Sequence, residues 1–223
     1  MTYTLHHGDC LDILPTLPSG SVDAVITDPP YPEIDRPYGR LTEAQWWDLM
    51  MGVCKETRRI LKPTGSAVFI LQPNSRKVGS MRGWLWEFMA WVCREWNMVQ
   101  DVWWWNTKMP PTIHTQRVNG LMRPSVKPCV WAGEANCYRQ QDNILWDESD
   151  ANKALRQSGR ARTDWTYHPS GHHFRESAIV EVAAERGGVT PFNLLPYSAG
   201  NSTSDSGAYG HGAGTPLKLA DWW

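Results

Sequence analysis

A carboxylate, two prolines and a phenol ring follow one another at Asp28-Pro29-Pro30-Tyr31, directly after the apolar run at residues 22–26. A strand over this run has to end at Asp28, because neither proline has an N–H to donate to a strand ladder. We expect a buried strand of a parallel sheet here, and ligands of open α/β sheets bind at the carboxyl ends of such strands. There the Asp28 carboxylate and the Pro29 carbonyl accept hydrogen bonds, and Tyr31 offers a flat face. The motif therefore favours binding of a planar group that carries an NH2.

Two flanking segments extend this motif. Gly-Asp-Cys at residues 8–10 turns into an amphipathic segment at residues 11–17, and Leu-Lys-Pro-Thr-Gly at residues 61–65 precedes a second apolar run at residues 66–71. With Asp-Pro-Pro-Tyr between them, these segments resemble the amino-methylating DNA methyltransferases. That family methylates adenine N6 or cytosine N4 and uses S-adenosylmethionine. The resemblance covers the first third of the chain well.

The resemblance implies a mechanism for the motif. An exocyclic amine is a weak nucleophile because its lone pair is delocalised into the ring. If the Asp28 carboxylate and the Pro29 carbonyl accept its two N–H groups, the lone pair localises on nitrogen and the methyl group transfers in line. The base first leaves the duplex stack, Tyr31 stacks on it, and Pro30 stiffens the wall of the site. Asp rather than Ser at position 28 favours adenine N6 over cytosine N4 within the family.

A cofactor site is implied in two parts of the chain. In the resembled family the residues at the positions of Asp9 and Cys10 lie against the cofactor's adenine. An Asp before an apolar-periodic segment is also a good helix N-cap, and the two roles are compatible. Residues 211–219 resemble the family's motif of a His, a Lys-Pro pair and a helix, with Thr-Pro in place of Lys-Pro. The residues expected to contact the cofactor are Asp9, Cys10, Asp28, His211, Thr215 and Pro216.

The order of the motifs implies a particular form of the fold. It resembles the permuted subgroup in which the catalytic motif comes first, then the target-recognition region, then a Phe-x-Gly-x-Gly loop that holds the methionine part of the cofactor. No Phe-x-Gly-x-Gly occurs in the 223 residues, so we expect the sequence to end just before that loop. The implied fold is α/β, a Rossmann-like class I methyltransferase three-layer sheet that is permuted and incomplete at its C-terminal end.

Hydrophobic periodicity predicts the elements around the motif. Thr42-Glu43-Ala44-Gln45 is a capping box that starts one helix, and an apolar stripe predicts a second helix at residues 83–96. The Trp residues of that stripe favour core packing over a platform for stacking bases. Strands are expected at residues 3–7, 22–26, 66–71, 98–105 and 126–132. A loop at residues 33–40 lies beside the end of the central strand and either closes over the base or is an ordinary exposed connection.

Two basic stretches without Asp or Glu, at residues 102–133 and 151–163, point to insertions in this core. Their cations suit DNA phosphates and their Gln, Asn and Arg suit base edges, although a basic run is more often a solvated face. The candidates for DNA contact are Lys108, Arg117, Arg123, Lys127, Arg156 and Arg160. Where the family often has an acid near the start of the strand at 126–132, this chain has Lys127. The catalytic core is predicted at residues 1–106, 126–133 and 187–223, and the target-recognition segments at residues 107–125 and 134–186.

Composition bears on charge, disulfides, membrane spans and metal sites. The net charge of −1 gives no global basic signal, so any charge that binds DNA has to be local. Five Cys without a Cys-x-x-Cys pair favour reduced thiols in the cytoplasm, and no apolar run reaches the length of a membrane span. His168, His172 and His173 lack a Cys or carboxylate pattern that would complete a metal site. The partners implied by the resemblance are double-stranded DNA, a second copy of the chain and a cognate restriction nuclease.

Two alternatives to an active DNA methyltransferase stay open. The absence of the cofactor loop fits a catalytically inactive, DNA-binding remnant of such an enzyme, which would not bind S-adenosylmethionine. A methyltransferase acting on glutamine side chains of proteins has a related motif that begins with Asn. Asp28 and the basic stretches speak against that second alternative.

Overall fold

The structure is a computed structural model, and it describes residues 3–37, 39–108, 115–167, 169, 171, 173–198, 215, 216, 219 and 223. The chain divides into two compact units. The first comprises Met1–Tyr138 and Asn193–Trp223, and the second comprises Arg139–Phe192. The second unit overlaps most of the segment predicted at residues 134–186, whereas the segment predicted at residues 107–125 belongs to the first unit.

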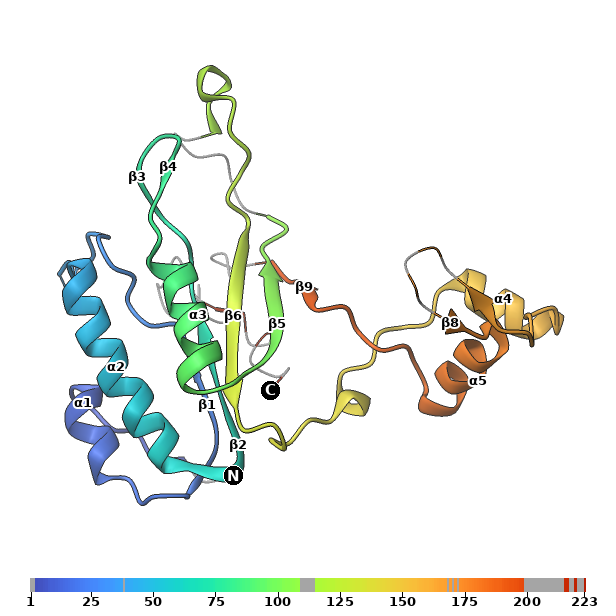
Figure 1. Cartoon of the computed structure of the whole chain (residues 1–223), viewed down its shortest axis with the longest axis horizontal. Coiled ribbons are helices and arrows are strands. Elements are labelled where there is room, and N and C mark those ends of the chain that lie inside the picture. The colour runs from blue at the N-terminus through green and yellow to red at the C-terminus, as the bar shows by residue number, and fades with distance from the viewer. Residues whose placement is uncertain are drawn as a thin grey trace. The chain divides into compact units, whose positions relative to one another are not determined.

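The first unit contains a five-stranded sheet in the order β1-β2-β6-β5-β9 (Figure 1). Its strands are β1 (Val22–Thr27), β2 (Leu61–Ile70), β5 (Met98–Trp105), β6 (Val126–Gly133) and β9 (Leu194–Pro196). β1 is parallel to β2, and β9 is parallel to β5, but β6 runs antiparallel to both of its neighbours. The α/β class is therefore confirmed with a mixed sheet. Because β6 is reversed, its first residues lie at the same edge as the last residues of β1 and β2.

Two long helices cover one face of this sheet, α2 (Glu43–Ile60) and α3 (Trp84–Glu95) (Figure 1). The predicted capping box at Thr42 is confirmed, with Gln45 returning the hydrogen bond. Apolar side chains on alternate sheet positions meet the helices: Phe69 from β2 packs among Trp46, Trp84 and Phe88. The aromatic stripe of α3 is thus mainly core, as predicted, because its inward positions face the sheet.

The opposite face of β2 and β6 is also covered. Val68 and Ile70 of β2 pack with Trp104 of β5 in a second apolar cluster. Leu219, near the end of the chain, is fully buried in that cluster, and the ring of Trp223 meets that of Trp131 edge-on at 6.3 Å. Residues near the C-terminus therefore complete the core of the first unit. A sheet buried on both faces explains why β2 and β6 are almost continuously apolar.

Two expectations about strands were wrong. Residues 3–7 form no strand, and Tyr3 and Leu5 are 92% and 87% exposed, because no neighbouring strand pairs with them. β1 has the predicted position but is only partly buried. It is an edge strand of the sheet, and its Ile26 is 38% exposed. Its alternation of half-buried and exposed positions follows from having a strand neighbour on one side only.

Shorter elements complete the first unit. The helix α1 (Cys10–Ile13) continues into a 3-10 turn at Leu14–Thr16 and packs against α2. A small hairpin pairs β3 (Ser75–Lys77) with β4 (Ser80–Met81), and a 3-10 turn at Arg117–Asn119 lies between β5 and β6. Among the described residues, no helix combines the length and the apolar character that a membrane crossing requires.

The second unit is built on two packed helices, α4 (Asp150–Ser158) and α5 (Glu176–Arg186). A 3-10 turn at Gln141–Asn143 precedes α4, and β7 (Thr166–Tyr167) pairs with β8 (His173–Phe174) between the helices. Ion pairs tie the unit together. Arg186 of α5 meets Asp142 at 2.7 Å, and Arg156 of α4 meets Glu148 at 2.6 Å.

Candidate active site

Two side-chain donors hold the main chain of the Asp-Pro-Pro-Tyr motif and of Pro32 next to it, and a third holds one of those donors. The indole N–H of Trp46 in α2 donates to the Pro30 carbonyl at 2.8 Å. The Asn74 amide donates to the Pro32 carbonyl at 2.6 Å, and the indole N–H of Trp84 in α3 in turn donates to the Asn74 side-chain oxygen at 3.0 Å. A turn built of prolines offers carbonyls but few N–H groups, so these side chains satisfy it. The core tryptophans therefore also fix the motif.

The Asp28 carboxylate is the centre of the site, at the carboxyl end of β1. The Tyr31 hydroxyl donates a short hydrogen bond to its Oδ1 atom. The Thr215 hydroxyl donates to its Oδ2 atom at 3.0 Å, and the Lys127 ammonium lies 3.9 Å from the same oxygen. Residues predicted from separate parts of the sequence thus meet at one carboxylate. Its side chain is 27% exposed, so a ligand has access to it.

Lys127 lies near the start of β6, where the sequence placed it, and its contact with DNA stays a prediction. Its side chain is only 16% exposed, and its ammonium lies 3.3 Å from the Tyr31 hydroxyl and 4.8 Å from the centre of the Trp104 ring. Burial lowers the pKa of Lys127, and the nearby Asp28 carboxylate acts against that shift. Sequence reasoning grouped Lys127 with cations that contact DNA phosphates. That reasoning missed the direction of β6. Because β6 is antiparallel to β2, its first residues lie at the sheet edge where Asp28 follows β1.

One further acceptor, the Pro29 carbonyl, and the Tyr31 ring lie beside the Asp28 carboxylate. No hydrogen bond within the described part of the chain uses the Pro29 carbonyl. The Asp28 carboxylate has about four lone-pair positions, so it can accept further bonds beside those from Tyr31 and Thr215. The Tyr31 ring is half-buried and nearly parallel to that of Trp84, with a centroid separation of 6.5 Å. Carboxylate, carbonyl and ring together form a site able to accept two N–H groups of a planar ligand.

The remaining predicted cofactor residues have individual roles in the structure. Asp9 caps α1 by accepting the Leu11 amide at 2.8 Å. Partial burial and the neighbouring Asp9 carboxylate raise the pKa of the Cys10 thiol. Among the described residues, no hydrogen bond or ion pair joins Asp9 or Cys10 to Asp28. The Pro216 carbonyl accepts the Leu219 amide at 3.0 Å. His211 lies outside the described residues.

The loop at residues 33–40 is anchored at both ends. The Arg40 guanidinium donates to the Glu33 carboxylate at 2.6 Å, and that carboxylate also accepts the Glu43 amide at 3.2 Å. Hydrogen bonding to Arg40 lowers the pKa of the Glu33 carboxyl. Arg36 and Gly39 pair across the turn between them. The described residues of this loop are therefore tied to one another, and both readings of the loop, closure over a base and an ordinary exposed connection, stay open.

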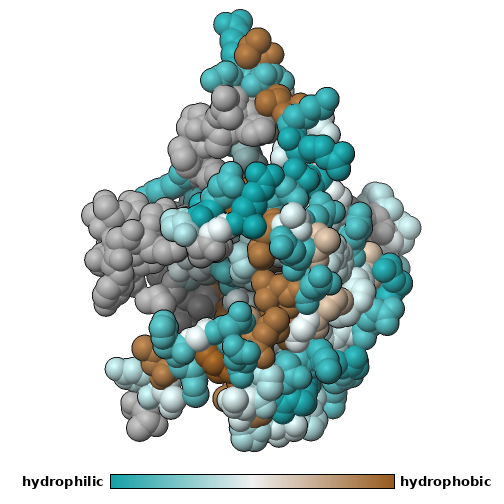
Figure 2. Space-filling view, turned by 90° about the vertical axis from the view of Figure 1, so that its left-hand side faces the viewer, coloured by the Kyte–Doolittle hydropathy of each residue, from teal (hydrophilic) through white to brown (hydrophobic). Residues whose placement is uncertain are grey.

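The other predicted DNA contacts fall into two groups. Lys108, Arg117 and Arg123 are exposed on described parts of the connection between β5 and β6. Residues 115–125 of this connection project from the sheet (Figure 1). This connection also exposes apolar side chains, with Val118 at 87% and Met122 at 93%, and hydrophobic atoms lie among hydrophilic ones at the top of Figure 2. In the second unit, Arg160 is exposed. Arg156 instead makes a two-pronged ion pair with the buried Glu148 carboxylate, at 2.6 and 2.8 Å.

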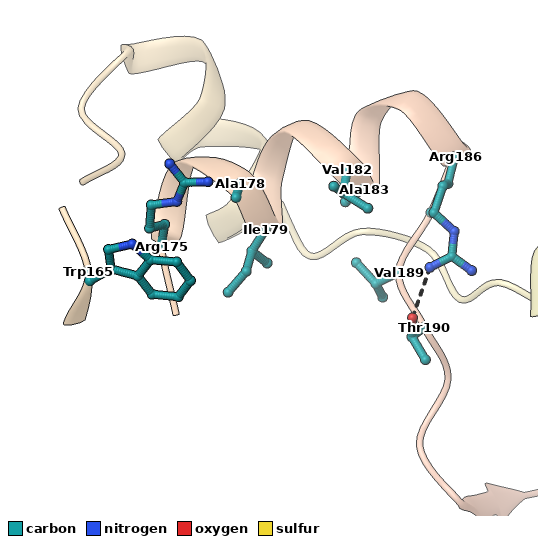
Figure 3. A pocket seen from close by; sticks show the side chains of 10 residues that line it. Trp165, Arg175, Ala178, Ile179, Val182, Ala183, Arg186, Val189 and Thr190 are labelled. Atoms are coloured by element: carbon teal, nitrogen blue, oxygen red, sulfur yellow. Dashed lines mark hydrogen bonds between the residues drawn. The ribbon is translucent and has the colours of Figure 1, made fainter. Parts of the chain in front are cut away.

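A groove of about 540 Å³ runs along α5 in the second unit (Figure 3). Its floor is apolar, with Ile179 and Val182 each 47% exposed. At one end the Arg175 guanidinium lies over the Trp165 ring at 5.2 Å, and at the other Arg186 donates to the Thr190 hydroxyl at 3.0 Å. The described residues that line the groove offer no carboxylate, thiol or imidazole. Within the described residues, no three His, Cys, Asp or Glu side chains gather as a metal site would need.

Comparison with known proteins places these features in a family. The DNA methylase family, whose members act at N6 or N4 amines, matches residues 22–220. The type II methyltransferase M.PvuII of Proteus hauseri is 24% identical over 99% of this chain and 68% of its own length. The solved structure of the PvuII cytosine-N4-specific DNA methyltransferase superposes with a TM-score of 0.63 at 20% identity, covering 96% of this chain and 66% of that one.

The superposition confirms the predicted methyltransferase type of α/β fold. The chain spans about two thirds of the length of the relatives it matches. A match over residues 22–220 includes the motif at Asp28, the basic connection, the second unit and Thr215. On that match, this chain belongs to the N6/N4 DNA methylase family.

Proposed function

We propose that this protein transfers a methyl group from S-adenosylmethionine to the exocyclic amine of a base in double-stranded DNA, at a specific sequence. The observation that carries the proposal is the arrangement at the end of β1. The Asp28 carboxylate and the Pro29 carbonyl stand next to each other, on a turn whose main chain is fixed by Trp46 and Asn74. An amine with two N–H groups needs two such acceptors. Fixed acceptors favour the transition state because they need no reorganisation during the reaction.

The residues at this strand end fit a sulfonium cofactor. The Thr215 hydroxyl donates to the Asp28 carboxylate at 3.0 Å, which leaves acceptor lone pairs on both groups for N–H or O–H groups of the cofactor. Asp9, Cys10, Asp28, Thr215 and Pro216 are the described residues that would hold it. When bound, the cofactor supplies the methyl group. Asp28 and Pro29 then orient the amine, and Tyr31 contacts the face of the flipped base.

Two observations bear on the choice of base and point in different directions. Asp at position 28 favours adenine N6, which stays our prediction from the motif. The relative that matches 96% of this chain in structure is cytosine-N4-specific, which favours cytosine N4 as the second candidate. Both bases present an amine next to a ring nitrogen, so the acceptors at Asp28 and Pro29 suit either. Hydrolysis of methylated DNA and chromatography of the nucleosides distinguishes N6-methyladenine from N4-methylcytosine.

The test of the proposal is transfer of labelled methyl from S-adenosylmethionine to DNA. The purified chain is expected to label duplex DNA, and Asp28→Ala is expected to abolish labelling while DNA binding is largely retained. Asp23→Asn is the matched control. Asp23 lies on β1, the strand that Asp28 follows, its side chain is 81% exposed, and within the described part of the chain it pairs with Lys62 alone. Full activity of Asp28→Ala would refute the proposed role of the carboxylate.

Two alternatives make different predictions in the same experiment. An inactive DNA-binding remnant would bind DNA without detectable binding of S-adenosylmethionine in a calorimetric titration. A protein glutamine methyltransferase would label protein and leave DNA unlabelled. A homodimer and a cognate restriction nuclease remain predictions from the family resemblance, and sedimentation of the purified chain tests the first of them.

A further inference from the structure

We propose that Lys127 is a positioning residue of the catalytic motif, whose ammonium holds the Tyr31 hydroxyl on the Asp28 carboxylate. This inference rests on the proposed function, because it gives Lys127 a part in methyl transfer. It also removes Lys127 from the set of cations that contact DNA phosphates. The carrying observation is one ammonium placed between the hydroxyl and the carboxylate of the motif, at 3.3 and 3.9 Å.

The topology of the sheet brings Lys127 to this place. β6 is antiparallel to β2, with Ile70 opposite Cys129, and the Leu71 amide donates to the Pro128 carbonyl at 3.0 Å. The next residue back along β6 is Lys127, which therefore lies beyond the last residue of β2. β1 ends at the same edge because it is parallel to β2, with Thr27 opposite Phe69. Two residues that are 99 positions apart in sequence thus meet: Asp28 and Lys127.

A fixed aromatic ring holds the ammonium in position. Trp104 lies opposite Lys127 in the pairing of β5 with β6, and its ring centre is 4.8 Å from the ammonium. The indole N–H of Trp104 donates to the Tyr197 carbonyl at 2.7 Å, which fixes the ring. A cation over an indole face is attracted by the ring electrons. Buried, paired and stacked in this way, the ammonium is a poor contact for a phosphate on the protein surface.

The contacts form a chain from Lys127 through Tyr31 to Asp28. The ammonium donates to the Tyr31 oxygen, and the Tyr31 hydroxyl donates to Oδ1 of Asp28. The direction of the Tyr31 hydroxyl is thereby set, which leaves defined lone pairs of the carboxylate for an amine. Without the ammonium, the Tyr31 hydroxyl loses the hydrogen bond from Lys127, and the Asp28 carboxylate loses that neighbouring cation. Small losses of orientation at a reacting group lower the rate of the chemical step more than they lower binding.

Steady-state kinetics and DNA binding separate positioning from phosphate contact. Lys127→Met keeps the length of the side chain and removes the charge and the donor. We expect its kcat to fall about 10- to 100-fold while KM for DNA changes by less than about twofold. Lys127→Arg restores a donor and a charge and should recover a substantial part of kcat. Lys62→Met is the control, because Lys62 stands at the other end of β2 and pairs with Asp23.

The salt dependence of DNA affinity identifies a residue that contacts a phosphate. A cation that contacts a phosphate contributes about 0.9 to the slope of log affinity against log salt. Arg123→Met, on the exposed connection before β6, should lower that slope by about this amount. Lys127→Met should leave it unchanged. A lower slope for Lys127→Met together with an unchanged kcat would overturn the proposal and return Lys127 to the DNA-contact set.

A third measurement does not depend on activity. In a double-mutant cycle of Asp28→Asn and Lys127→Met, the two shifts in Tm should differ from additivity by about 2 °C or more, because the groups interact directly. Additive shifts would refute the pairing of Lys127 with the motif. A coupled cycle in a protein that transfers no methyl group would instead refute the proposed function while the contact itself stands. The two failures are therefore distinguishable.

Discussion

The Thr215 hydroxyl donates a 3.0 Å hydrogen bond to the Asp28 carboxylate, across 187 positions of sequence. The contact joins the first motif of the chain to a segment near its end. Both residues were predicted to contact the cofactor, and the structure brings them together on one carboxylate oxygen. Leu219 and Trp223 support this arrangement by packing in the core cluster under the sheet.

Thr215→Val should weaken cofactor binding. The substitution keeps the shape of the side chain and removes the hydroxyl that fixes the Asp28 carboxylate and would accept a hydrogen bond from the cofactor's ammonium. A hydrogen bond that involves a charged group is worth about 1.5–3 kcal/mol. We expect the Kd for S-adenosylmethionine, measured by calorimetry, to rise about 10- to 100-fold. Thr4→Val at an exposed position is the control. An unchanged Kd would mean that Thr215 does not take part in holding the cofactor.

Trp46→Phe should impair both stability and methyl transfer. Phe keeps a ring in the core but cannot donate to the Pro30 carbonyl, which Trp46 reaches at 2.8 Å. Loss of that bond and of ring volume should lower the free energy of unfolding by about 2–4 kcal/mol, measured in urea. Trp86→Phe on α3, where Trp86 is 49% exposed, should change it by less than about 0.5 kcal/mol. Equal losses of stability in the two variants would contradict the role of Trp46 in the core and at the Pro30 carbonyl.

Thiol labelling of the native protein should distinguish two groups of cysteines. Cys10 and Cys93 are exposed, whereas Cys54, Cys129 and Cys137 are buried. At pH 8 an aromatic disulfide reagent should modify only the two exposed thiols rapidly, and all five in denaturant. Cys93 should react faster than Cys10, because the pKa of Cys10 is raised and less of it is thiolate. Rapid modification of Cys54 in the folded protein would contradict the buried core.

Alkaline pH should destabilise the fold through the buried thiols. Burial raises the pKa of both Cys54 and Cys129 from 9.0 to about 12. Because the pKa is higher in the folded state, each buried thiol stays protonated up to a higher pH in the folded protein than in the unfolded chain. The contribution to stability is therefore complete below pH 9 and is lost as the pH rises towards 12.

The loss should be about 1.4 kcal/mol per pH unit for each thiol in that window. Urea unfolding at several pH values measures it. Replacing Cys129 with Ala should reduce the slope between pH 9 and 11, while Cys93→Ser should leave the slope at the wild-type value. A slope that is identical in all three proteins would show that the buried thiols do not titrate on unfolding.

Local sequence predicted most elements because their signals are local. The capping box at Thr42 starts α2, and the prolines after Asp28 end β1, since both effects depend on neighbouring residues only. The strand predicted at residues 3–7 failed because a strand also needs a partner, which no local pattern supplies. The expectation that β1 is buried failed for a similar reason. The composition of a strand does not say whether that strand lies at the edge of the sheet.

The sequence alone determined the chemistry of the motif: a carboxylate, a carbonyl and a ring at the end of a strand, in a chain of the N6/N4 DNA methylase family. Only the tertiary structure decided which distant residues join it. Thr215 reaches Asp28 from near the C-terminus, and Lys127 reaches it because β6 is reversed. The physical reason is that strand direction and sheet order depend on pairing between distant segments. Those pairings place Lys127, which the sequence predicted to contact DNA, beside the Asp28 carboxylate.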